Sequence, residues 1–179
     1  MVASFLLAFC RLVLSFVFAL SFVGKLRDVR GLRQTILNFH ILPHWLNWLS
    51  GVITFFVLVS ELLVIMGGVL GGMFLLPTFV FAAFLLILFS GTLMSVLVRQ
   101  VHTSCNCFGK SDKPVSVGDL WRNGGLLCCA LGGSALFFWS QQEQASLPWA
   151  AWFLAGGAGI VFVALLFSIG DLIALFQSW

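Results

Sequence analysis

Five long apolar stretches constrain the fold of this chain more than any other feature of its sequence. They cover, approximately, residues 2–23, 45–69, 74–98, 117–139 and 149–176. A helix needs about 20 apolar residues to cross the hydrocarbon core of a bilayer. Only 8% of the 179 residues are charged, against about 25% in a typical soluble domain. The sequence therefore predicts an all-α, polytopic transmembrane helical bundle, with a four-helix core plus one further span, formed by residues 1–179 as a single membrane domain.

The connections between these stretches predict how the spans are arranged. Residues 24–44 place apolar side chains at roughly helical spacing between basic ones, which indicates an amphipathic segment at the membrane interface. An ordinary polar connector is the alternative. The short sequence GGVLGG at 67–72 predicts an antiparallel hairpin of the second and third spans. Residues 99–116 form a polar loop, and the S-x-x-D pattern of Ser116 and Asp119 predicts that a helix begins directly after it.

The polar loop carries two cysteines, Cys105 and Cys107, separated by one residue. A disulfide between them would close a small, strained ring, and strained disulfides tend to be labile, catalytic or regulatory. Lys110 is a candidate to stabilise a thiolate there, so we interpret the two cysteines as a redox pair. A metal site with His102 as third ligand, suited to Cu(I), and a pair without chemistry are the alternatives. The other cysteines lie inside apolar stretches, where we expect small packing residues: Cys10, Cys128 and Cys129.

Two charged residues fall deep inside the apolar stretches, Arg11 in the first and Glu61 in the second. An ionisable residue within a membrane span indicates a functional site by default. At 1.5 Å per residue, both positions lie at a similar depth from the same interface. We therefore expect Arg11 and Glu61 to form an intramembrane pair. A structural role and a role in redox or proton chemistry both remain open.

A series of short motifs, taken in order, resembles the methylamine-utilisation protein MauE family, within the broader MauE/DoxX group. The motifs are Arg11, GKLRD at 24–28, ILP at 41–43, Glu61, CNCFG at 105–109, VS at 115–116 and RN at 122–123. The similarity covers most of the chain through the fourth span. It adds Lys25, Arg122 and Asn123 as supporting residues of a site.

The resemblance implies a membrane protein that helps to mature a periplasmic redox enzyme, such as methylamine dehydrogenase with its disulfide-rich small subunit. A thioredoxin-like partner would exchange electrons or disulfides with Cys105 and Cys107, acting as a thiol-disulfide oxidoreductase pair. The layout also resembles vitamin K epoxide reductase and DsbB, which pass electrons to quinones. This chain lacks their Cys-x-x-Cys and second loop pair, so we expect a redox-active disulfide and no cofactor, with quinone chemistry doubtful. A non-catalytic assembly factor is the alternative function, and a Cu(I)-handling membrane protein is a weaker one.

The basic residues predict an orientation that conflicts with the resemblance. They gather in and near residues 24–44 and 99–116, on one face of the bundle. The positive-inside rule places such a face in the cytoplasm, whereas disulfides persist in the periplasm. We favour a bacterial inner membrane protein with its cysteine loop on the periplasmic side. Basic residues beside spans are expected to contact lipid head groups, and we expect no nucleic-acid partner.

Overall fold

Each of the five apolar stretches forms a helix in the computed structural model, which describes residues 2–29, 49–98, 117–140 and 148–177. Side chains are described in these ranges except at 49, 140 and 169–177. The elements are α1 (Val2–Arg27), α3 (Leu49–Leu70), the 3₁₀ turn η2 (Gly72–Phe74), α4 (Leu75–Val98), α5 (Val117–Ser140) and α6 (Trp149–Gln177). The described residues contain no strand, so the predicted all-α class is confirmed. The helix boundaries match the predicted spans to within a few residues.

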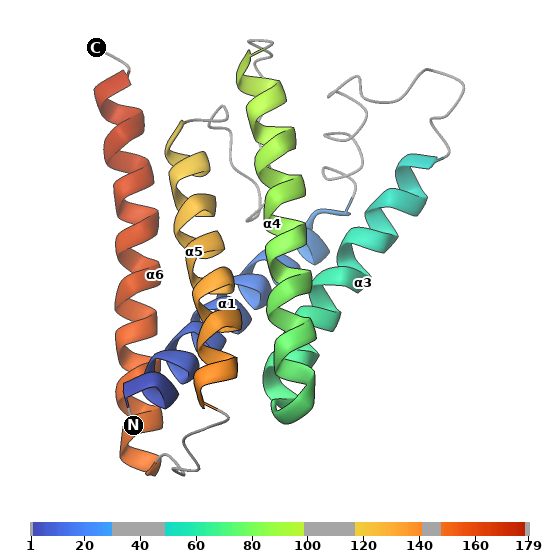
Figure 1. The fold of residues 1–179 in the computed structure, drawn as a ribbon. Helices are drawn as coiled ribbons and strands as arrows, with labels where there is room; N and C mark the ends of the chain where they lie inside the picture. The colour runs from blue at the N-terminus through green and yellow to red at the C-terminus, as the bar shows by residue number, and fades with distance from the viewer. Residues whose placement is uncertain (1, 30–48, 99–116, 141–147, 178–179) are drawn as a thin grey trace.

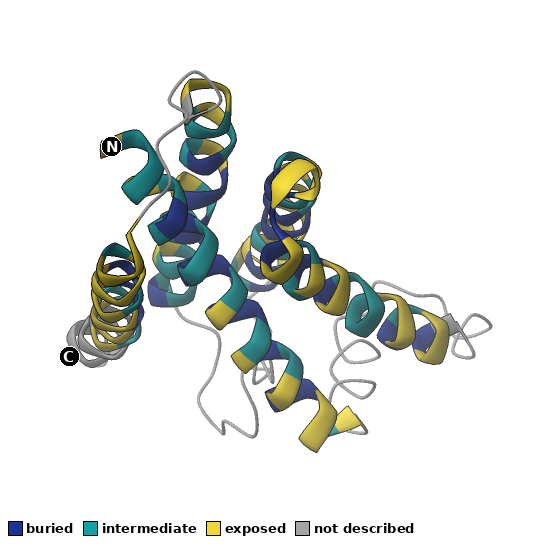
Figure 2. Ribbon diagram, turned by 90° about the horizontal axis from the view of Figure 1, so that it is seen from below, coloured by how far each residue is buried: buried dark blue, intermediate teal, exposed yellow. Residues whose placement is uncertain are grey.

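Helix α1 is the centre of the bundle, because it packs against α3, α5 and α6. It is inclined across the bundle, while α4, α5 and α6 run more nearly parallel to one another (Figure 1). Helix α4 packs against α5 and α3. The buried faces of the helices turn toward this shared interior and their exposed faces turn outward (Figure 2). The most deeply buried large side chains include Val13, Phe79 and Leu126.

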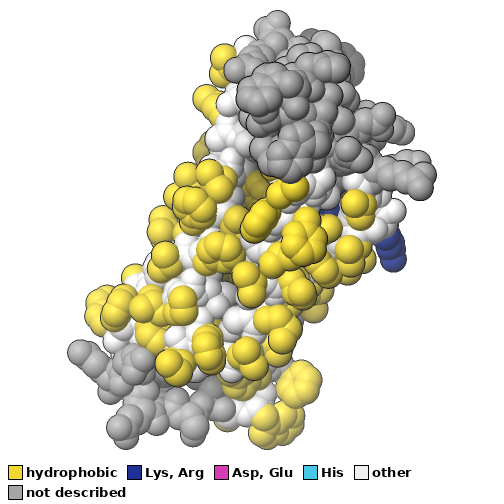
Figure 3. All heavy atoms as spheres, turned by 90° about the vertical axis from the view of Figure 1, so that its right-hand side faces the viewer, with side chains coloured by type: hydrophobic (Ala, Val, Ile, Leu, Met, Phe, Trp, Pro, Cys, Tyr) yellow, Lys and Arg dark blue, Asp and Glu magenta, His cyan; other side chains and the backbone are white. Residues whose placement is uncertain are grey.

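The outer surface is apolar, as a lipid-facing surface must be. Hydrophobic side chains cover the middle of the face shown in Figure 3. On α3 and α4 the exposed side chains include Phe55, Phe56, Phe84 and Ile87. Four helices of the described residues are long and apolar enough to span a membrane: α1, α3, α4 with η2, and α6. Helix α5 is more polar, and it packs against α1, α4 and α6. The protein is thus a multi-pass helical membrane bundle.

The hairpin predicted from GGVLGG is confirmed, and its glycines supply the turn. Helix α3 ends at Leu70, and Gly71 and Gly72 then adopt positive φ angles of 68° and 59°. Side-chain-bearing residues rarely adopt this conformation, whereas glycine does so without steric cost. The Gly71 N–H also donates to the Gly67 carbonyl at 3.1 Å. The chain therefore reverses within a few residues and places α4 antiparallel to α3.

The connection between α1 and α3 begins later than predicted. The amphipathic segment was expected to begin at residue 24, but α1 continues to Arg27. Gly24 and Lys25 are buried residues of that helix. Leu26 and Arg27 are exposed. Residues 30–44, the remainder of the predicted segment, lie outside the described residues.

A close approach between α4 and α5 makes Gly133 sensitive to substitution. A Cβ atom at Gly133 would lie 2.6 Å from the ring of Phe79, which is only 1% exposed. Overpacking of this kind typically costs about 1–3 kcal/mol. We expect Gly133→Ala to lower the free energy of unfolding in detergent by about that amount. The matched control is Gly132→Ala one position earlier, where nothing lies within 4 Å. Equal stability of the two variants would contradict this packing.

Candidate functional site: a buried ion pair and its pocket

The ion pair between Lys25 and Glu61 is the main polar feature of the described interior. Lys25 Nζ contacts Glu61 Oε1, although the two side chains are only 3% and 0% exposed. Lys25 comes from the last turns of α1, and Glu61 comes from the middle of α3. An isolated charge is costly to bury, so buried ions in proteins are nearly always paired. Each of these charges makes the burial of the other tolerable.

Ser21 completes a small network with this pair. It lies one helical turn before Lys25 and therefore on the same face of α1. The Ser21 hydroxyl donates to Glu61 Oε1 at 2.9 Å and accepts from Lys25 Nζ at 3.1 Å. The ring of Phe89, from α4, lies 4.8 Å from Lys25 Nζ, within the range of a cation–π contact. Oε1 of Glu61 thus receives both donors, while Oε2 has no hydrogen-bond partner among the described residues.

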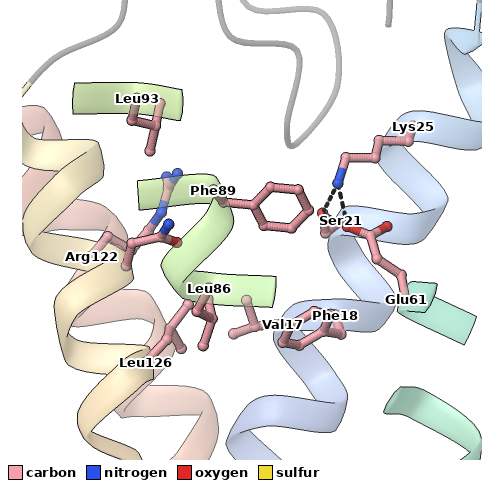
Figure 4. A pocket seen from close by; sticks show the side chains of 11 residues that line it. Val17, Phe18, Ser21, Lys25, Glu61, Leu86, Phe89, Leu93, Arg122 and Leu126 are labelled. Atoms are coloured by element: carbon pink, nitrogen blue, oxygen red, sulfur yellow. Dashed lines mark hydrogen bonds and ion pairs between the residues drawn. The ribbon is translucent and has the colours of Figure 1, made fainter. Parts of the chain in front are cut away.

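A pocket opens beside the ion pair and extends toward α5. Its empty volume, with its open mouth included, is about 450 Å³. Figure 4 shows Lys25, Ser21 and Glu61 on one side and Arg122 on the other, with the Phe89 ring projecting between them. Apolar side chains make up the rest of the lining: Val17, Phe18, Leu86, Leu93 and Leu126. The pocket therefore joins one polar group inside the bundle to another at the start of α5.

The polar residues of α5 are held by neighbours on three helices. Arg122 pairs with Asp119 at 3.1 Å, one turn earlier on the same helix. Its guanidinium also lies 4.8 Å from the ring of Phe167 on α6. Asn123 Nδ2 donates to Ser90 Oγ on α4 at 3.2 Å. Both α5 side chains line the pocket, so the structure gathers four predicted site residues around one cavity: Lys25, Glu61, Arg122 and Asn123.

The predicted pairing of Arg11 with Glu61 is wrong. Arg11 donates from Nε to the carbonyl of Gly68 and from Nη2 to the carbonyl of Val69 at 2.9 Å. It therefore caps carbonyls at the C-terminal end of α3, which have no partner within the helix and carry partial negative charge. The Trp152 ring on α6 lies 5.2 Å from the guanidinium carbon. The Arg11 guanidinium therefore has its polar and aromatic partners at the C-terminal end of α3, away from Glu61.

The tilt of α1 explains this difference. The depth estimate assumed that both helices start at one interface and run perpendicular to the membrane. Helix α1 is instead inclined (Figure 1), and its C-terminal turns meet the middle of α3. Glu61 lies 12 residues after Leu49, about 18 Å along α3, yet its partner is near the end of α1. The partner of Glu61 is consequently a residue that the sequence placed at the interface.

The predicted cysteine site belongs to the connection between α4 and α5. Cys105, Cys107, Lys110 and His102 all lie outside the described residues. Within the described part of the chain, no group of three or more His, Cys, Asp or Glu side chains is placed to hold a metal ion. The three helix cysteines are unbonded thiols: Cys10 and Cys129 are buried and Cys128 is exposed. Cys10 and Cys129 belong to the hydrophobic core, as expected of packing residues. The same prediction for Cys128 is wrong, because its side chain faces outward from α5 and is exposed.

The sequence did not point to Ser21, Phe89 and Ser90, which contact Lys25 or Asn123. Only Ser21 carried a usable signal, since residues four apart on a helix are neighbours and Lys25 was already of interest. Phe89 and Ser90 lie in an apolar run with no distinguishing pattern. Their contributions depend on how α4 packs against α1 and α5, which the sequence alone does not reveal.

The fold and this site define a class: a multi-pass helical membrane protein with a buried, paired carboxylate beside a polar-ended pocket. Residues 3–139 match the family described as Methylamine utilisation protein MauE. Because the match covers well over half of the chain and includes every residue of the ion pair and pocket, the chain belongs to the MauE family. No curated protein and no solved structure matches the chain.

Proposed function

We propose that this protein is a membrane thiol-disulfide redox protein that acts in the maturation of a periplasmic redox enzyme. Cys105 and Cys107 form the redox pair, and a thioredoxin-like protein is the exchange partner. The client is an enzyme of the methylamine dehydrogenase kind, in keeping with the methylamine-utilisation family. The protein lies in the bacterial inner membrane, with the cysteine-bearing connection on the periplasmic side. No cofactor is required beyond the cysteine pair itself.

The observation that carries this proposal is the connectivity of the pocket. Residues 99–116, which hold both cysteines, join the end of α4 to the start of α5. Those two helix ends supply Leu93, Arg122 and Asn123 to the pocket. A dithiol is thus attached at the end of the bundle where its polar residues are concentrated. Arg122 follows this connection in the first turns of α5, and a positive charge close to a cysteine favours the thiolate, which is its reactive form.

The chemistry of the exchange needs only the two thiols and a partner disulfide. One thiolate attacks a sulfur of the partner disulfide, forms a mixed disulfide and releases the partner's other sulfur as a thiolate. The second cysteine then attacks the mixed disulfide, and the partner leaves with both of its cysteines reduced. The pair on this chain ends oxidised, and the same steps run in reverse for reduction. Two electrons and two protons move in total, so no further reactant is needed.

Trapping the mixed disulfide tests the proposal directly. If Cys105 and Cys107 are replaced by Ser one at a time, the variant that retains the attacking cysteine should accumulate a disulfide-linked complex. Non-reducing gel electrophoresis and mass spectrometry would identify a thioredoxin-like protein in that complex. The background for both variants is a chain in which Cys10, Cys128 and Cys129 are Ala. Absence of any reducible complex in both variants would overturn the proposal.

The side of the membrane is a separate part of the proposal with its own measurement. In the same background, an impermeant thiol reagent added to whole cells whose outer membrane has been permeabilised should label Cys105 and Cys107. The control is Ser140→Cys in a chain that lacks the five native cysteines. Ser140 is the last residue of α5, so its labelling tests the side of the membrane opposite to the start of that helix. Labelling of the loop pair only after lysis would place it in the cytoplasm, as the positive-inside rule predicts.

A further inference from the structure

We infer that Glu61 is an intramembrane proton-exchange site, reached by water through the pocket that opens at Arg122. The inference concerns Glu61 and the pocket alone, and it holds whether or not the cysteine pair acts in thiol exchange. It starts from one unsatisfied atom. Glu61 is fully buried, and its Oε2 accepts no hydrogen bond from any described residue.

An unsatisfied buried oxygen is unfavourable, and the pocket offers the means to satisfy it. Leaving a buried acceptor without a donor costs about 1–3 kcal/mol, and more when the group is charged. Buried waters usually occupy such positions when a polar space lies beside them. Glu61 lines the pocket, so a water there has room beside the carboxylate. The other carboxylate oxygen is already engaged by Lys25 and Ser21.

The pocket also extends from Glu61 toward less deeply buried residues. Its far side is formed by Arg122 and Asn123 in the first turns of α5. The side chains of Arg122 and its partner Asp119 are 14% and 26% exposed, in contrast to the fully buried Glu61. The pocket therefore has a polar group at each end, with apolar side chains lining the space between them. The ring of Phe89 lies between the two polar ends (Figure 4), and we expect it to restrict the passage of water.

Among the side chains that the structure describes, the charges that face Glu61 come from two helices. Lys25 on α1 faces it directly, and Arg122 on α5 faces it across the pocket. Asp119 balances Arg122, and the pocket residues that α4 supplies are apolar: Leu86, Phe89 and Leu93. The proton transfer is simple: hydronium at the inner end of the pocket gives a proton to Oε2, the carboxylate becomes a carboxylic acid, and water remains. Lys25 then loses the negative charge that balanced it.

Infrared spectroscopy of the full-length protein in lipid nanodiscs tests this inference. On acidification, a carboxylic C=O band should appear that is absent from Glu61→Gln. It should remain in Asp119→Asn, which removes the carboxylate that pairs with Arg122. On transfer to D₂O the band should shift without unfolding of the protein, and Phe89→Ala should speed that shift by widening the path. Glu61→Asp, which keeps a carboxyl group, should retain a band at a changed frequency even if Glu61→Gln folds poorly.

The outcomes separate this inference from the proposed redox function. The same spectra should be obtained when Cys105 and Cys107 are both Ser, because the proton site does not depend on them. A spectrum that is identical in wild type, Glu61→Gln and Glu61→Asp would overturn the inference. So would a Glu61 band that does not shift in D₂O, since the carboxyl would then be closed to water. Failure to trap a mixed disulfide would leave these results unchanged.

Discussion

Replacement of Lys25 by Met should lower the free energy of unfolding by about 3–5 kcal/mol, the usual cost of removing one partner of a buried ion pair. The substitution keeps most of the apolar volume of the lysine chain but leaves the Glu61 carboxylate buried without its cation. Because only the ionised carboxylate is penalised, the loss should be greater at alkaline pH and smaller at acid pH, where Glu61 is protonated. Unfolding in detergent, followed by helical circular dichroism across a pH series, would measure it.

Two controls separate the ion pair from a general effect of removing a basic residue. Arg27→Met, two positions later on the exposed surface of α1, should change stability by less than about 0.5 kcal/mol. The double variant with Met at 25 and 61 should regain most of the lost stability, because apolar replacement of a whole buried pair is often neutral or stabilising. A Lys25→Met variant as stable as wild type at alkaline pH would contradict a charged buried pair.

Replacement of either Cys105 or Cys107 by Ser should abolish maturation of the client enzyme, if the proposed redox function is correct. A single cysteine can form a mixed disulfide but cannot resolve it, so each substitution breaks the cycle at one step. The readout is the activity and disulfide content of the client in cells that depend on this protein. The amount of the variant in the membrane must be measured in parallel.

The same experiment distinguishes the redox function from a non-catalytic assembly factor. If the cysteines only staple a loop, the double Ser variant should retain part of the maturation activity in proportion to its abundance. The matched control replaces Cys10, Cys128 and Cys129 by Ala and should leave maturation intact, because Cys10 and Cys129 are core packing residues. Copper bound stoichiometrically to the purified protein and lost on removal of Cys105, Cys107 or His102 would instead favour metal handling.

The helices were predictable from sequence because membrane insertion imposes a length and an apolar composition on each span. The stretches 74–98 and 117–139 agree with α4 and α5 almost to the residue. The turn at Gly71 was also predictable, because four glycines in six residues between two apolar stretches indicate a tight reversal of the chain. Helix α5 formed as predicted, although its polar residues Asp119, Arg122 and Asn123 are held by protein contacts instead of lipid.

The partner of Glu61 could not be derived from depth alone. Counting residues gives the position of a side chain along its own helix, but the crossing of two helices depends on how their side chains pack. The tilt of α1 moves Lys25 to the middle of α3 and moves Arg11 to the end of that helix. Lys25 was nevertheless predicted as a site residue, because it belongs to the GKLRD motif. Its position along the chain alone would have placed it at the membrane interface.

The Arg11 guanidinium occupies the space that a side chain at position 71 would need. A Cβ atom at Gly71 would lie 2.8 Å from the Arg11 guanidinium nitrogens, at a residue whose φ of 68° already disfavours a side chain. A side chain at position 71 would require the Arg11 guanidinium to shift, and its hydrogen bonds to the carbonyls of Gly68 and Val69 would have to change with it. A substitution of Gly71 should therefore be accompanied by a change at position 11, although the two positions are 60 apart in the sequence.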